Sequence, residues 1–424
     1  MALGDIYQKA SLVQIPSGYK AADAELYSVV PNTTAGDFTV SVDADATRVN
    51  KDGLVESVAA NQARLDYNPT NPQDPTLLLE PQRTNYATNN SSMDTYGTVG
   101  GSSPSPTLTA DYTTAPDGSN TATRLQATVT GSNYSLIQFP STPNGNGTYY
   151  ISVYAKSNTG SNQTISFYGN SSSTNAHTVT TEWTRIIVEA TRGSGLTKYA
   201  YLGTWASQHG SDASIDISVW GAQIEVDSNY ATSLIPTSGS AVTRTVDFIS
   251  NSYTGLTSAS GTIFIDFDTK GFDFSFSKII ALRDTVTGDS LRLEPFDNSG
   301  TKKFAFFGIN GSSATPPSED ILPINNRKKI ALTFENGNFK YASDGVITTG
   351  TYSGTARQYN QIGGANITGG AMHNGIIHQF MVFNEALTDA ELQTLTSQWN
   401  CLKNMSLTLR NRQSKRLPRF HIAK

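Results

Sequence analysis

The side chains that can carry out catalysis are spread through this sequence without the spacing of a familiar catalytic motif. There is no G-x-S-x-G elbow, H-E-x-x-H pair, phosphate-binding loop or G-x-G-x-x-G fingerprint. Asp266 and Asp268 alternate along a predicted strand, so both carboxylates lie on one face, where they can serve solubility, calcium binding or glycoside cleavage. We predict a non-enzyme and keep glycoside cleavage as an alternative. The five histidines are scattered: His177, His209, His373, His378 and His421.

Aromatic side chains in turn-rich segments are better candidates for binding. An aromatic ring packs on the C–H face of a sugar, while neighbouring amides and acids bind the sugar hydroxyls. Trp205 lies in the polar segment LGTWASQHG at 202–210, where it is either an exposed platform or a core residue. We predict that it binds sugar, together with Tyr134, Tyr168 and Tyr201 on the same face.

The remaining aromatic candidates are weaker. Trp183 and Trp220 lie within predicted strands, and Trp399 ends a predicted helix, so we expect all three in the core. Three further candidates for ligand binding lie in predicted loops nearer the C-terminus: Tyr352, Tyr359 and Asn360.

The composition is that of a β-rich protein with a neutral polar surface. The chain has 424 residues, of which 37% are hydrophobic and 15% charged, with 35 Gly, 19 Tyr and 18 Phe. Its single cysteine, Cys401, cannot form a disulfide within the chain, so packed cores or subunit contacts must stabilise the fold. No stretch reaches the roughly 20 apolar residues of a membrane span, and no secretory signal opens the chain. We expect synthesis in a cytoplasm.

The net charge of −5 is unevenly distributed. Residues 403–424 carry seven Lys or Arg and no acid, which leaves the other residues at −12. This basic tail can bind phosphates, dock on an acidic protein surface or remain disordered. Apolar residues alternate with its charges and favour protein docking, so we do not expect nucleic acid as a partner.

Two series of strands indicate an all-β fold of tandem β-sandwiches. Alternating runs such as 149–155 and 214–220 recur between Asn-Gly turns, which predicts one sandwich over 85–247. A second series, including 261–267 and a hairpin around Asn336-Gly337, predicts another over 248–400. Thr388 and Glu391 form a capping-box pattern that predicts one short C-terminal helix. Residues 1–84 read as an irregular N-terminal region, and 401–424 as the basic tail.

Several segments resemble bacteriophage structural proteins and tail fibres. They are ATRV at 46–49, GLVE at 53–56, RLDY at 64–67 and LLLEPQRTN at 77–85. WGAQIE at 220–225, YATSLIPT at 230–237 and AVTR at 241–244 resemble the end of a carbohydrate-binding-module-like jelly roll. IHQFMVFNEALTDAEL at 377–392 resembles the last strand and helix of a concanavalin A-like (laminin-G-like) sandwich.

This resemblance implies a virion structural protein, a tail or head fibre or spike subunit that attaches to host-surface glycan. A head-decoration protein without glycan binding and a glycan-degrading tailspike remain alternatives. The implied partners are other virion proteins, host glycan and copies of the chain itself, and the implied location is the virion, assembled in the host cytoplasm. We predict no cofactor and no metal site, although both resembled folds often hold a structural calcium.

The resemblance to fibres further implies a homotrimer, anchored through residues 1–84. The sequence predicts few paired strands in that region, too few to cover Leu54, Val55, Leu65 and residues 77–79. We therefore expect a neighbouring subunit or another virion protein to cover them. We assign six arginines to assembly: Arg48, Arg64, Arg83, Arg410, Arg412 and Arg416.

Overall fold

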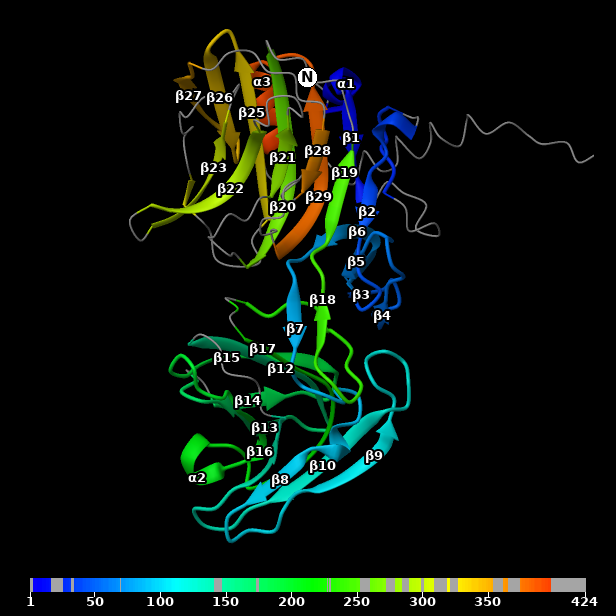
Figure 1. The fold of residues 1–424 in the computed structure, drawn as a ribbon, viewed down its shortest axis with the longest axis vertical. Helices are drawn as coiled ribbons and strands as arrows, with labels where there is room; N and C mark the ends of the chain where they lie inside the picture. The colour runs from blue at the N-terminus through cyan, green and yellow to red at the C-terminus, as the bar shows by residue number, and fades with distance from the viewer. Residues whose placement is uncertain are drawn as a thin grey trace, which may run out of the picture. The chain divides into compact units, whose positions relative to one another are not determined.

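The computed structural model describes residues 3–16, 26–31, 34–68, 70–140, 147–172, 175–226, 228, 230–251, 260–271, 279–283, 290–298, 301–308, 319–320, 327–353, 361–364 and 374–397. The chain forms two compact units, each assembled from separate segments. Unit 1 comprises Met1–Ser41, Gln62–Glu80 and Asp247–Lys424, and unit 2 comprises Val42–Asn61 and Pro81–Val246. The fold is mostly β, as predicted, with antiparallel strand pairing throughout the described ladders (Figure 1).

Unit 2 is a sandwich of two five-stranded sheets (Figure 1). The first has the order β15-β12-β17-β10-β9, with β9 at Thr107–Thr113, β10 at Ala122–Thr128, β12 at Thr148–Ser157, β15 at Thr184–Thr191 and β17 at Ser214–Val226. The second has the order β14-β13-β16-β11-β8, with β8 at Gly97–Gly100, β11 at Ser135–Gln138, β13 at Gln163–Gly169, β14 at Ala176–Val179 and β16 at Ala200–Thr204.

Alternating apolar residues from both sheets fill the space between them. Ile151 and Val153 of β12 and Ile217 of β17 meet Phe167 of β13 and Leu202 of β16 in one buried cluster. The 3₁₀ turn η3 (Met93–Thr95) adds a buried methionine to this cluster. Two small ladders complete unit 2: the β3 (Thr47–Val49) and β4 (Val55–Ser57) hairpin, and the pair of β7 (Arg83–Asn85) with β18 (Val242–Arg244).

Unit 1 is a second sandwich, in which Phe267 packs edge-on against Phe304 between the sheets. One sheet runs β27-β26-β25-β20-β29-β6-β5, with β1 also paired to β29; these strands are β27 (Val346–Thr351), β26 (Asn338–Ser343), β25 (Arg327–Glu335), β20 (Ser260–Gly271), β29 (Asn374–Phe383), β6 (Asn71–Leu79), β5 (Leu65–Asn68) and β1 (Leu12–Gln14). The other runs β2-β19-β28-β21-β22-β23-β24, with β2 (Thr39–Ser41), β19 (Phe248–Asn251), β28 (Gln361–Gly364), β21 (Ile280–Arg283), β22 (Ser290–Asn298), β23 (Thr301–Phe307) and β24 (Glu319–Asp320).

The predicted C-terminal helix is confirmed as α3 (Asp389–Thr396). Its capping box is complete, because Thr388 Oγ1 accepts the Glu391 N–H and the Glu391 carboxylate accepts the Thr388 N–H at 2.8 Å. Helix α1 (Leu3–Lys9), which the sequence pattern did not predict, packs with α3 in an apolar cluster on unit 1. No helix in the described ranges is both long and apolar enough to cross a membrane.

Residues 1–84 are not a separate N-terminal region. Residues 1–41 and 62–80 belong to unit 1 and 42–61 to unit 2, so the expected boundary at 84 does not correspond to a division of the fold. Leu65 and residues 77–79 are buried in the strands of unit 1, and Val55 is buried in unit 2. Only Leu54 of the expected apolar set is exposed, at 36%. The chain itself covers these residues, so our reason for expecting a partner to cover them is wrong.

The three described arginines assigned to assembly are engaged within the chain. Arg64 is fully buried and pairs with Glu80 at 2.8 Å and with Asp247, all within unit 1. Arg48 pairs with Glu56 across the β3–β4 hairpin at 2.7 Å. Arg83 donates to Ser228 Oγ at 3.2 Å, and its guanidinium lies over the Tyr230 ring. Arg64 is therefore a core residue of one subunit, contrary to its assignment. Arg410, Arg412 and Arg416, with the whole basic tail, lie outside the described residues.

Candidate functional site

A group of aromatic side chains covers the outer face of the β14-β13-β16-β11-β8 sheet. Tyr168 of β13 lies opposite Tyr201 of β16 in the strand register. The next residues along each strand, Phe167 and Leu202, point into the core of the sandwich. Because successive side chains of a strand point to opposite faces, Tyr168 and Tyr201 must point outward. Both are half-buried.

The rings on this face contact one another in a continuous series. Tyr199 and Tyr201 stack with centroids 6.4 Å apart, and Tyr201 and Tyr168 stack at 5.4 Å. Trp205 lies 6.3 Å from Tyr168 and 5.0 Å from Tyr134. The His209 ring contacts both Tyr168 and Trp205, with centroid distances of 4.4 Å and 5.1 Å. We call the six residues Tyr134, Tyr168, Tyr199, Tyr201, Trp205 and His209 the aromatic face.

Buried hydroxyl groups fix the backbone of Trp205 at the end of β16. The Trp205 N–H donates to Ser166 Oγ at 3.0 Å and to Ser211 Oγ at 2.9 Å. Ser166 and Ser211 bond to each other at 3.0 Å and are both buried. Such satisfied buried polar groups set a position tightly. The indole is therefore attached to a rigid point of the sheet, although it lies in a turn-rich segment.

A single helical turn, α2 (Ala206–His209), brings His209 against Trp205. The His209 N–H donates to the Trp205 carbonyl at 2.9 Å, which places residues i and i+4 on the same side of the turn. Gly210 ends the turn with φ of +72°, a left-handed conformation that favours glycine. The polar LGTWASQHG segment is thus a compact turn that presents two rings, rather than a mobile loop.

Burial favours the neutral forms of three residues of the aromatic face: Tyr168, Tyr201 and His209. Burial raises the pKa values of Tyr168 and Tyr201, and neighbouring tyrosines add to the shift. Burial also lowers the pKa of His209 below its ordinary 6.5, and its Nδ1 is buried without a partner in the described chain. The Arg192 guanidinium lies 5.2 Å over the Tyr199 ring at one end of the series. At neutral pH the face therefore offers neutral rings, with one cation at its margin.

The arrangement suits the binding of a ligand with apolar faces. The faces of half-exposed rings on a rigid sheet can pack against the C–H groups of a ligand. The phenol hydroxyls at the ring edges can form hydrogen bonds with its polar groups. Gln138 of β11 lies directly opposite Tyr201 and adds an amide beside the rings. Within the described residues no group of three His, Cys, Asp or Glu side chains is placed to hold a metal ion.

The structure brings together four of the residues predicted for sugar binding: Tyr134, Tyr168, Tyr201 and Trp205. Sequence reasoning missed Tyr199 and His209. Tyr199 could have been found from its i, i+2 spacing to Tyr201, which places both on one face of a strand. His209 could have been found only if 206–209 had been recognised as a helical turn.

The candidates outside this face have other positions. Tyr352 is 9% exposed, and its ring lies edge-on to Phe334, so little of its surface faces solvent. Its N–H donates to the Gly337 carbonyl at 2.8 Å. Its role in binding stays a prediction. Tyr359, Asn360 and Trp399 lie outside the described residues. Trp220 is buried, as expected. Trp183 is half-buried rather than core, with its Nε1 donating to the Thr114 carbonyl at 3.1 Å.

The two carboxylates considered for acid–base chemistry both contact basic side chains of unit 1. Asp266 is fully buried and accepts two hydrogen bonds from Arg327, at 2.6 and 2.7 Å. Asp268 contacts His378 Nε2 at 2.9 Å. The two hydrogen bonds from Arg327 offset the cost of burying the Asp266 carboxylate, which explains why it is tolerated there.

Comparison of the sequence with protein-family models and with curated proteins found no match. Comparison of the structure found distant similarity to parts of other proteins. Domain 4 of the arabinanase AbnA from Geobacillus stearothermophilus, solved with arabinotriose, has 17% identity and a TM-score of 0.29, covering 36% of this chain and 73% of that one. Trypanosoma rangeli sialidase has 13% identity and a TM-score of 0.26, covering 32% and 22%. The botulinum neurotoxin type G receptor-binding domain has 14% identity and a TM-score of 0.26, covering 35% and 39%. Likenesses at this level carry no argument about a ligand.

Proposed function

We propose that this chain binds glycan through the aromatic face of unit 2. The observation that carries the proposal is the continuous series of half-buried rings from Tyr199 to Tyr134, held by paired strands and by the hydroxyl network under Trp205. Half-exposed stacked rings are costly to leave facing water, and a sugar ring covers them while its hydroxyls still reach phenol and amide groups.

We further propose that the chain is a non-enzymatic structural protein of a phage virion, a tail or head fibre or spike subunit that attaches the particle to host-surface glycan. The support is the resemblance of 46–85, 220–244 and 377–392 to phage virion proteins, together with the lack of a catalytic motif in the sequence. A single stacked site binds weakly, so several copies on one particle would raise the affinity by avidity.

A homotrimer belongs to this proposal. Light scattering on the full chain tests it, and a monomer at micromolar concentration would contradict it.

Adsorption of the full chain to purified bacterial surface polysaccharides tests the proposed function. We expect saturable binding to at least one polysaccharide, a loss of more than tenfold in Trp205→Ala and Tyr201→Ala, and no release of oligosaccharides. Trp183→Ala is the matched control, because Trp183 is a half-buried tryptophan of the same unit that lies outside the aromatic face. Equal losses in Trp183→Ala and Trp205→Ala would contradict the assignment of the site. Oligosaccharide release would make the chain a glycan-degrading tailspike.

A further inference from the structure

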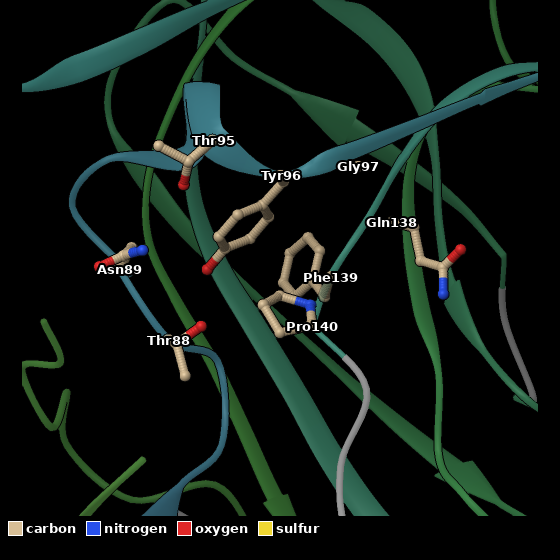
Figure 2. Close-up of a pocket in the computed structure, with 8 residues that line it drawn as sticks. All are labelled: Thr88, Asn89, Thr95, Tyr96, Gly97, Gln138, Phe139 and Pro140. Atoms are coloured by element: carbon tan, nitrogen blue, oxygen red, sulfur yellow. The ribbon is translucent and has the colours of Figure 1, made fainter. Parts of the chain in front are cut away.

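A cavity lies beside the aromatic face at the ends of β8 and β11. It has a volume of about 370 Å³ and is lined by eight residues: Thr88, Asn89, Thr95, Tyr96, Gly97, Gln138, Phe139 and Pro140. Figure 2 shows these residues around the cavity, with Tyr96, Phe139 and Pro140 forming its apolar side. The volume is near the lower end of the range of roughly 300–1,000 Å³ found for ligand sites.

The cavity contains an unused hydrogen-bond donor. Tyr96 is only 6% exposed, and its hydroxyl has no hydrogen-bond partner within the described chain. Its ring is fixed edge-on against Phe139, with centroids 5.3 Å apart, so the hydroxyl cannot easily turn elsewhere. A buried hydroxyl without a partner destabilises a fold unless water or a ligand bonds it. Figure 2 shows that the hydroxyl end of Tyr96 points to the space between Asn89, Thr88 and Pro140.

A second donor faces the same space. Asn89 Oδ1 accepts the Gly239 N–H at 2.6 Å, which fixes the orientation of its side-chain amide. Figure 2 shows the Asn89 amide nitrogen on the side of Tyr96. Two N–H or O–H donors that face one space can share an acceptor oxygen of a ligand. None of the eight lining residues carries a charge, so an uncharged ligand is favoured over an ion.

Gln138 connects this cavity to the aromatic face. Gln138 of β11 pairs with Tyr201 of β16 on one side and with Gly97 of β8 on the other. Since Tyr201 in turn pairs with Tyr168 of β13, the four residues form one row that runs across the strands. Neighbouring Cβ atoms in such a row are about 5 Å apart, roughly the width of one sugar ring. The next sugar along this row would lie over Gln138, at the rim of the cavity. Tyr96 and Phe139 point to the inner side of the sheet, so a glycan reaches the Tyr96 hydroxyl by turning over the sheet edge beyond Gln138.

We propose that the cavity is a second sugar subsite, which receives a neutral monosaccharide unit of the same glycan with a ring or acetamido oxygen accepting hydrogen bonds from Tyr96 and Asn89. This inference rests on the proposed function of the aromatic face. It adds that the preferred glycan has an uncharged residue next to the stacked one, and that affinity rises when an oligosaccharide is long enough to fill both positions.

Two variants alter the cavity and keep all six residues of the aromatic face. Tyr96→Phe removes the unpaired hydroxyl and should leave the melting temperature unchanged or raised. Gly97→Leu adds a bulky side chain at the rim of the cavity, in the row that holds Gln138. The position tolerates it, because no described atom lies within 4 Å of where a Cβ would be and the Gly97 backbone does not have positive φ. The probes are the monosaccharide to hexasaccharide fragments of whichever polysaccharide binds the wild-type chain.

We expect Tyr96→Phe to bind the hexasaccharide about five- to tenfold more weakly, the effect of losing one hydrogen bond. Gly97→Leu should weaken hexasaccharide binding at least as much, because its side chain obstructs the rim. Both variants should bind the monosaccharide like wild type. Trp205→Ala should weaken the binding of both fragments. If both cavity variants fold normally and bind every fragment like wild type while Trp205→Ala does not, the subsite is wrong and the proposed function stands. If the wild-type chain binds no polysaccharide, the proposed function and the subsite are both wrong.

Discussion

Tyr168 and Tyr201 lie opposite each other on neighbouring strands, and their rings stack with centroids 5.4 Å apart and an interplanar angle of 28°. The pair is positioned by the backbone ladder before any ligand arrives. Rigid aromatic side chains lose little conformational entropy on binding, which is why preordered rings are effective contact surfaces. Trp205 and His209 extend this pair to Tyr134, so that residues far apart in the sequence form one surface.

Replacing Trp205 should affect binding much more than folding. Trp205→Ala loses ring contacts with Tyr134 and His209, worth about 1 kcal/mol of unfolding free energy, while its backbone bonds to Ser166 and Ser211 remain. Trp220→Ala is the contrasting variant: Trp220 is 4% exposed and bonds Thr121, so its loss should cost about 3–5 kcal/mol. Urea unfolding measures both. A Trp205→Ala loss as large as that of Trp220→Ala would show that Trp205 is a core residue.

The stability of unit 2 should fall below pH 6.5 because of His209. Burial lowers the pKa of His209 from 6.5, so the unfolded chain takes up a proton at a higher pH than the folded chain. Above pH 6.5 both states are neutral and His209 contributes no pH dependence. As the pH falls through 6.5 the unfolded state is favoured, until the folded pKa is also passed.

Ring-proton NMR titration, with His209→Gln to assign the resonance, measures this pKa. The variant should also lose part of the fall in melting temperature between about pH 7 and pH 5. A His209 midpoint at or above 6.5 would contradict the buried, neutral imidazole.

Arg64 should be essential for folding rather than for assembly. Arg64→Met leaves the Glu80 and Asp247 carboxylates buried without their cation, which should cost about 3–5 kcal/mol of unfolding free energy. Arg48→Met removes a more exposed pair with Glu56 and should cost under about 1 kcal/mol. Chemical denaturation compares the two. Equal, small losses of unfolding free energy in Arg64→Met and Arg48→Met would contradict the structural role that we assign to Arg64.

Deleting residues 1–16 should damage unit 1 rather than release an anchor. Strand β1 pairs with β29, and Ile6 and Val13 pack with Leu392 and Leu395 around α3. Lys9 also pairs with the buried Glu391 at 2.8 Å. The truncated chain should show a lowered melting temperature and rapid proteolysis within 260–397. A truncated chain with the wild-type melting temperature and a changed oligomeric state would contradict this prediction. It would show that residues 1–16 serve assembly and are dispensable for folding.

The sequence indicated the β-sandwiches, the capped helix and four of the six aromatic-face residues, because alternation and capping are local patterns. It did not indicate that Arg64 is buried, since its partners Glu80 and Asp247 are distant in the chain and only the fold brings them together. The low exposure of Tyr352 was not indicated for a related reason: a position after a strand does not reveal burial, which depends on packing against Phe334. The division of residues 1–84 between two units likewise follows from strand pairing with segments far downstream.

The most direct measurement of the central claim uses the full chain labelled with 5-fluorotryptophan. The chain has four tryptophans, whose ¹⁹F resonances can be assigned with single Trp→Phe variants. On titration with the hexasaccharide of a bound polysaccharide, the glycan-binding account predicts a saturable shift of the Trp205 resonance, with those of Trp183 and Trp220 unchanged. Saturable binding that shifts Trp183 or Trp399 and leaves Trp205 unchanged would contradict it.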